Sequence, residues 1–125
     1  MDPLDRLRAL CLALPQAIER DSHGPGSFFV QNTPSGRRQF LSIDDHHHGV
    51  DHVGFWCAAP AGSQEALIAA DPRRYFRPPY VGHRGWVGVR LAAEGLPAPD
   101  WTEIEEIVHD AYRTVASPRL RALLS

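Results

Sequence analysis

The order of hydrophobic patterns along the chain constrains the fold most. A helical repeat lies near each end, and segments that alternate with period two lie between them. The first repeat starts after Asp2, with Pro3 in its first turn, and ends before Pro15. Its apolar residues form one stripe that is expected to face inward, namely Leu4, Leu7, Leu10, Cys11 and Leu14. The second begins at Asp100 and Glu103, which resemble a capping box, and continues to Val115.

The middle of the chain predicts strands at Ala17–Asp21, Ser27–Gln31, Arg37–Ile43, Asp51–Ala59 and Trp86–Leu91. Polar turns are expected at Asn32–Gly36 and Asp44–Gly49. A short helix at Ala61–Ala70 ends at Asp71-Pro72, and a last short helix begins at Pro118. Because Pro78-Pro79 interrupts Tyr75–Tyr80, this stretch is expected to be extended and irregular at a sheet edge.

Strands in a meander with helices at the ends indicate a two-layer α+β fold. We expect an antiparallel sheet of about five strands, with the N- and C-terminal helices packed on one face, in a single domain over residues 1–125. No apolar run approaches the roughly eighteen residues of a membrane span. The N-terminus also lacks the layout of a signal peptide, so we expect a cytoplasmic protein with no membrane partner.

Positive charge is concentrated in one stretch, Asp71–Leu91, which contains five of the thirteen Arg residues and one acid. Lys is absent, and the formal net charge of −2 argues against non-specific coating of nucleic acid. The stretch itself has a net charge of +4, so the remainder has −6. Such a basic patch on an acidic body can still steer a phosphate-bearing partner.

Side-chain alternation predicts what lies on the second face of the sheet. If Val87, Val89 and Leu91 face the helices, Trp86 and Arg90 point the other way. The same reasoning places four further side chains on that face, namely His52, Trp56, Arg38 and Phe40. Phe40, Trp56 and Trp86 then form a candidate face for a protein partner or a homodimer. The alternative is that a loop, a helix or a second subunit covers this face and makes it core.

The same surface suggests nucleic-acid or phosphate binding by Arg73, Arg74, Arg77, Arg84, Trp86 and Arg90. Guanidinium groups contact phosphates, and aromatic rings stack on bases. Within this set, Gly82–Gly85 is either an ordinary turn or a loop that offers backbone N–H groups and Arg84 to a phosphate. It lacks the context of a nucleotide-binding loop.

Metal, redox and catalytic signals are sparse. His46, His48 and His52 are the metal candidates, but adjacent histidines in a turn seldom converge on one ion, so a solvated turn is the favoured interpretation. We therefore expect no cofactor and no obligatory metal. Cys11 and Cys57 occupy apolar positions, which predicts buried free thiols. No nucleophile, base and orienting group form a recognisable set, so no catalytic residue is assigned and a non-enzymatic role is expected.

Several motifs together resemble the MmcQ/YjbR-like family. They are LPQAIERDSHGPGSFFV, the DDHH turn, ALIAADPRRYFRPPYVGHRGWVGVRL and DAYRTVASPRLRALL. The most specific is PPYVGHRGWVGV, in which Arg84 stands where Lys is usual. The resemblance implies a small α+β sheet backed by helices, similar to secretion chaperones. Members are generally labelled DNA-binding proteins because their hairpins look like wings, and the family offers no established catalytic residues.

Two functions are weighed equally at this point, a DNA-binding module that uses the Arg and aromatic surface, and a protein-interaction or dimerising domain. A small-ligand binder or enzyme ranks third. Exposure of Phe40, Trp56 and Trp86 beside the Arg side chains is the observation that separates these possibilities.

Overall fold

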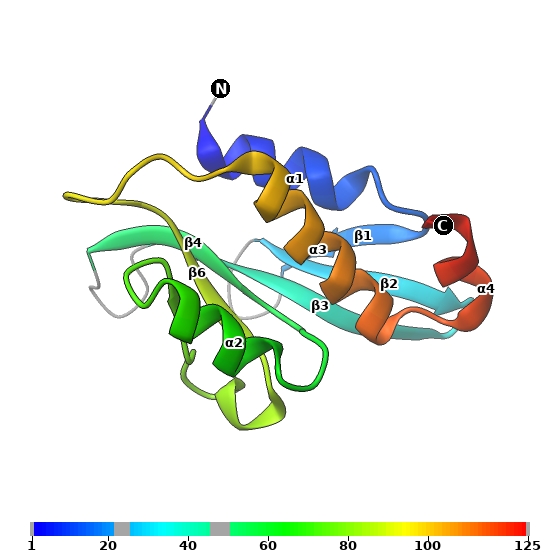
Figure 1. The fold of residues 1–125 in the computed structure, drawn as a ribbon. Coiled ribbons are helices and arrows are strands. Elements are labelled where there is room, and N and C mark those ends of the chain that lie inside the picture. Colours follow the sequence, from blue (N-terminus) through cyan, green and yellow to red (C-terminus); the bar gives the residue numbers. More distant parts are fainter. Residues whose placement is uncertain (1, 22–25, 46–50, 125) are drawn as a thin grey trace.

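The computed structural model describes residues 2–21, 26–45 and 51–124. One antiparallel sheet has the strand order β1-β2-β3-β4-β6-β5, and Figure 1 shows α1 and α3 lying on the same face of it. The strands are β1 Ala17–Arg20, β2 Ser27–Thr33, β3 Gly36–Asp45, β4 His52–Cys57, β5 Tyr75–Phe76 and β6 Val87–Ala93. The helices are α1 Pro3–Leu12, α2 Ser63–Ala70, α3 Trp101–Val115 and α4 Pro118–Arg121, with short 3-10 turns η2 Gly82–Arg84 and η3 Ala122–Leu124.

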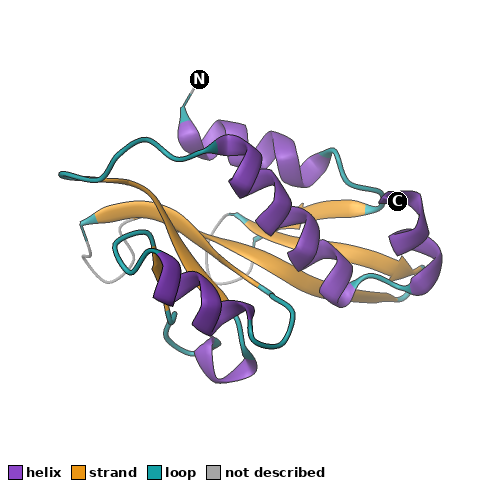
Figure 2. Ribbon diagram, in the orientation of Figure 1, coloured by secondary structure: helices purple, strands orange, loops and turns teal. Residues whose placement is uncertain are grey.

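The α+β class, the antiparallel sheet and the helix-covered face are confirmed, as Figure 2 shows. The sheet has six strands rather than about five, because Tyr75–Phe76 pairs with β6 as a short edge strand. A proline pair, Pro78-Pro79, begins one residue beyond this two-residue strand and explains its length, since proline lacks the N–H that a ladder needs. None of the helices in the described ranges is long and apolar enough to cross a membrane.

Local capping explains where the two main helices begin. The Asp2 carboxylate accepts a hydrogen bond from the Leu4 N–H at 2.8 Å, and the Asp100 carboxylate accepts one from the Thr102 N–H at 3.0 Å. These side chains satisfy N–H groups that the first turn of a helix leaves unpaired. Both starts follow the sequence prediction.

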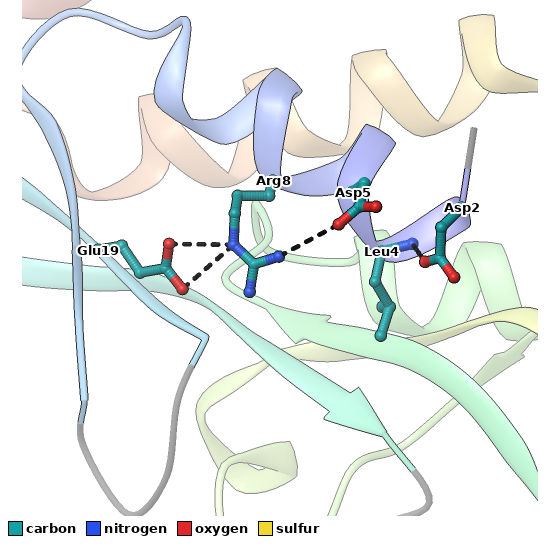
Figure 3. Close-up of polar contacts among 5 residues, drawn as sticks. All are labelled: Asp2, Leu4, Asp5, Arg8 and Glu19. Carbon is teal, nitrogen blue, oxygen red and sulfur yellow. Dashed lines mark hydrogen bonds and ion pairs between the residues drawn. The ribbon is translucent and has the colours of Figure 1, made fainter.

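An ion pair fixes α1 against the edge strand β1. Arg8 Nε lies 3.0 and 3.3 Å from the two carboxylate oxygens of Glu19, and Arg8 Nη1 lies 3.7 Å from Asp5 (Figure 3). The hydrogen bond with Glu19 raises the pKa of the Arg8 guanidinium. Because Arg8 and Glu19 are both partly exposed, the pair orients the helix more than it stabilises the fold.

The core lies between the sheet and the helix layer, with Tyr112 of α3 at its centre. The Tyr112 ring meets Phe40 edge to face, with 5.9 Å between centroids, and both side chains are completely buried. The Tyr112 hydroxyl donates a hydrogen bond to the Pro15 carbonyl at 2.6 Å, which joins α3 to the end of α1. Burial raises the pKa of this hydroxyl.

Phe40 corrects one prediction from side-chain alternation. Phe28 pairs with Leu41 while Phe29 pairs with Gln39, so Phe40 is an extra residue in β3. The bulge lets both Phe40 and Leu41 face the helices, and it also puts Arg38 on the face of its partner Val30. Phe40 therefore belongs to the core, and neither Phe40 nor Arg38 lies on the second face.

A further correction concerns the turn expected at Asp44–Gly49. Asp44 and Asp45 are the last residues of β3 and pair with Gly54 and Val53. The remainder of that turn, including His46 and His48, lies outside the described residues.

Candidate functional site

The second face is the face of the sheet opposite α1 and α3. Directly paired residues point to the same face, and Trp56 alternates with the core residues Phe55 and Cys57. One cross-strand row of this face is therefore Arg20, Ser27, Ser42, Trp56, Gly88 and Phe76. A neighbouring row contains Asp44, Gly54 and Arg90. The predicted positions of Trp56 and Arg90 are confirmed.

Asp44 holds two aromatic side chains of β4 in place. Its Oδ2 accepts a hydrogen bond from Trp56 Nε1–H at 3.1 Å and lies 2.6 Å from His52 Nε2. Asp44 is 2 % exposed and His52 is 7 % exposed. A buried carboxylate is costly unless it accepts hydrogen bonds, and the Trp56 and His52 side chains are its partners here. The indole ring of Trp56 is thereby oriented by a polar network rather than by packing alone.

Phe76 forms a stacking surface at the β5 edge. Its ring lies against Gly88, where a Cβ would come within 2.4 Å of the ring carbons. The Arg90 guanidinium lies over this ring at 4.4 Å from the centroid, and the His52 ring lies 5.3 Å away. Cation–π contact of this kind keeps an arginine extended along the surface. Arg90 Nη1 also donates a hydrogen bond to the Arg73 carbonyl at 3.2 Å, so this carbonyl and the Phe76 ring together position the charge of Arg90.

The prediction that Trp86 offers an accessible ring is also wrong, because this side chain is only 4 % exposed. Gln64 of α2 donates hydrogen bonds from Nε2 to the Trp86 carbonyl at 2.5 Å and to the Gly82 carbonyl at 2.9 Å. The segment 82–86 is therefore tied to α2. Trp86 offers no free ring for a base or a partner, but the exposed Arg84 lies over its ring at 5.3 Å.

Tyr80 is the most exposed large aromatic group of this region, with 69 % of its surface accessible. The Val81 N–H bonds to the Pro79 carbonyl at 2.7 Å, and Tyr80 between them has φ of 66°. This is the rare, strained form of the γ-turn. Tyr80 lies 6.4 Å from Trp56 between ring centroids. A bulky residue at positive φ that keeps its ring in solvent is a feature that often marks function.

The predicted phosphate-binding arginines fall into two groups. Arg74 is 7 % exposed and donates to the main-chain carbonyls of Arg90, at 2.7 Å, and Pro97. It is a structural residue, and its assignment as an accessible ligand is wrong. Arg73 donates to the Gly95 carbonyl at 2.8 Å but remains exposed. Arg77 is also exposed, and its stem lies over Gly82.

The segment Gly82–Gly85 is an ordinary turn. The N–H groups of Gly82, Arg84 and Gly85 bond to main-chain carbonyls of Pro78, Val81 and Gly82. Gly85 closes the turn with φ of 85°, which explains the choice of glycine. Because these three N–H groups are already paired, they are not available to a phosphate at this turn.

The metal and cysteine predictions have different outcomes. Among the described residues, no group of three His, Cys, Asp or Glu side chains could hold a metal ion. His52 lies against Asp44, whereas His46 and His48 are outside the described part of the chain. Cys11 and Cys57 are buried free thiols, as predicted, and burial raises the pKa of both.

Sequence reasoning did not single out Tyr80 as a site residue, and it considered Asp44 only as part of the turn that contains the metal candidates. A proline pair before an aromatic residue and a nearby glycine were the available signal for Tyr80, since this pattern favours an unusual turn. Asp44 carried no such signal, because an Asp-Asp-His sequence is typical of a polar loop.

The comparisons with known proteins concern family and fold. A family model described as YjbR matches residues 12–114. The crystal structure of the Deinococcus radiodurans protein DR2400, with a domain described as DUF419, is similar to this chain with a TM-score of 0.73 and 22 % identity. That similarity covers 99 % of this chain and 88 % of the other. The comparison with curated proteins gave no match. On the family match, this chain belongs to the YjbR family.

Proposed function

We propose that this protein binds nucleic acid through its second face, in a binding rather than a catalytic role. The observation that carries the proposal is the strained, 69 % exposed Tyr80 beside Trp56. Tyr80 is exposed in the turn after β5, and Trp56 is half-buried on β4. Aromatic rings presented in this way stack with unpaired bases, and such stacking contributes about 1–3 kcal/mol per base. Duplex bases are already stacked, so single strands are the expected ligand.

Arg77, Arg84 and Arg90 supply the charge around these rings. All three lie in the segment of net charge +4, and Arg84 and Arg90 are held over aromatic rings at 5.3 and 4.4 Å. A guanidinium held in this way loses less conformational freedom when it contacts a phosphate. Arg73, Arg74 and Trp86 are left out of this binding role by their contacts or burial.

Fluorescence anisotropy of labelled single-stranded and duplex oligonucleotides, measured over a salt series, tests the proposal. Tyr80→Ala is expected to weaken single-strand binding by a factor of roughly five to one hundred. Arg84→Ala is expected to reduce the slope of log K against log salt by about 0.7, the value for one lost phosphate contact with a single strand. Arg38→Ala removes the same charge from an exposed residue on the other face and serves as the control.

Absence of binding at low salt would overturn the proposal. So would binding that Tyr80→Ala and Arg84→Ala leave at the wild-type level, or that Arg38→Ala weakens equally.

A homodimer through the same surface is the second candidate. A protruding tyrosine beside a tryptophan is a typical interface anchor. Light scattering at increasing protein concentration tests this candidate, which predicts a dimer that Tyr80→Ala and Trp56→Ala dissociate. A monomer at all concentrations would exclude it. Phe40 is buried and contributes to neither function, and the buried Trp86 contributes only as the ring that holds Arg84.

A further inference from the structure

A groove lies between α2 and α3 on the helix-covered face, away from the surface proposed for nucleic acid. Its volume is about 240 Å³. Val87 lies at its floor, and Ala66 and Leu67 of α2 and Ile107 of α3 add further apolar surface. This volume is below the usual range of small-molecule sites, so the groove suits one or two side chains of a larger partner.

The rim on the α3 side is acidic. Glu103, Glu106 and Asp110 all line the groove, and their spacing of three and four residues places them in one row along the helix. The Tyr75 hydroxyl donates a hydrogen bond to Glu103, and Arg113 lies 3.3 Å from Asp110. Glu106, between them, takes part in none of the ion pairs among residues 2–21, 26–45 and 51–124.

We propose that this groove docks a basic segment of another protein, with an Arg or Lys side chain lying in it. The aliphatic stem of such a side chain covers the apolar floor while its cation reaches the carboxylates. An acidic or purely apolar segment would offer no cation to Glu106. Charge complementarity at Glu106 therefore identifies the chemistry of the partner.

A fluorescein-labelled peptide of alternating Leu and Arg, titrated with the full chain, is the probe, and the same peptide with Glu for Arg is its control. The first peptide is expected to bind and the second to show no binding. Glu106→Gln is expected to weaken binding about fivefold, as for one partly screened ion pair. Ala66→Phe is expected to weaken binding at least as much, because its ring would fill the groove without changing the charge.

Glu105→Gln is the matched control, since it removes the same charge from an exposed neighbouring residue that does not line the groove. It is expected to change the affinity less than twofold. The proposal is overturned if the Leu/Arg peptide does not bind at low salt, or if Glu105→Gln weakens binding as much as Glu106→Gln. Self-association that Glu106→Gln abolishes would also overturn it, because the occupant would then be a second copy of this chain.

Discussion

The contact between Gly88 and Phe76 permits a quantitative test of the stacking surface at the β5 edge. A Cβ on Gly88 would lie 2.4 Å from the Phe76 ring, whereas carbon atoms normally pack at about 3.6 Å. The ring would have to move by about 1.2 Å to accommodate it. Arg90 and His52 both contact this ring, which limits where it can go. We therefore expect Gly88→Ala to lower the free energy of unfolding by about 2 kcal/mol.

The same substitution should have the opposite sign when the ring is absent. In a Phe76→Ala background the clash between the new methyl group and the Phe76 ring is removed. Alanine in a strand interior is then favoured over glycine by about 0.5 kcal/mol, because glycine loses more backbone entropy on folding. The coupling between the two positions is accordingly about 2.5 kcal/mol, within the range measured for residues in contact.

Urea unfolding of the wild type, both single variants and the double variant, followed by circular dichroism, measures this coupling. The m-value must stay constant across the four proteins for the comparison to hold. The reasoning is refuted if Gly88→Ala changes the free energy of unfolding by the same amount, within about 0.5 kcal/mol, in the wild-type and Phe76→Ala backgrounds. The Phe76 ring would then lie elsewhere, and the placement of Arg90 for phosphate contact would lose its basis.

Three further predictions concern the core and its links. Tyr112→Phe should lower the free energy of unfolding by about 1 kcal/mol, because the Pro15 carbonyl loses its hydroxyl donor; urea unfolding measures it. Gln64→Leu leaves two buried carbonyls without that donor, so we expect a loss of about 2 kcal/mol and faster amide exchange in residues 82–86. Cys11 and Cys57 should react with a thiol reagent only at the rate of unfolding. Burial raises the pKa of both thiols in the folded protein above the ordinary value of 9.0. Their contribution to the free energy of unfolding is therefore fully present below about pH 9 and is lost as the pH rises further. Urea unfolding across alkaline pH measures this loss.

Hydrophobic periodicity predicted the parts of the fold that depend on local sequence. The stripe of α1, the Asp100 cap of α3 and the alternation of Val87 and Val89 follow from residue order alone, and the structure confirms them. The second half of the predicted capping box does not form, because Glu103 accepts a hydrogen bond from the Tyr75 hydroxyl instead. The residues of the second face were predicted correctly only where a strand contains no bulge before them. Trp56 and Arg90 lie there as expected.

Phe40 was misplaced because a bulge depends on the register with a neighbouring strand. One extra residue reverses the alternation for everything beyond it, and no local signal distinguishes Gln39-Phe40-Leu41 from a regular strand. Arg74 was misassigned for a similar reason. Its partners, the Arg90 and Pro97 carbonyls, come from segments 16 and 23 residues away, so its burial depends on tertiary structure.

The two proposed surfaces have opposite charge, and Trp56 and Arg90 lie on the face of the sheet opposite the groove, which makes the tests separable. The sheet lies between Arg90 and the groove, and packed layers are about 10 Å apart. Charges influence one another over only about 8 Å at physiological ionic strength. Glu106→Gln should therefore change oligonucleotide affinity less than twofold, and Arg90→Ala should leave the affinity for the Leu/Arg peptide unchanged. Anisotropy with both probes on both variants measures this. If each variant altered both affinities, net charge rather than local geometry would govern binding, and neither Tyr80 nor the α2–α3 groove would define a site.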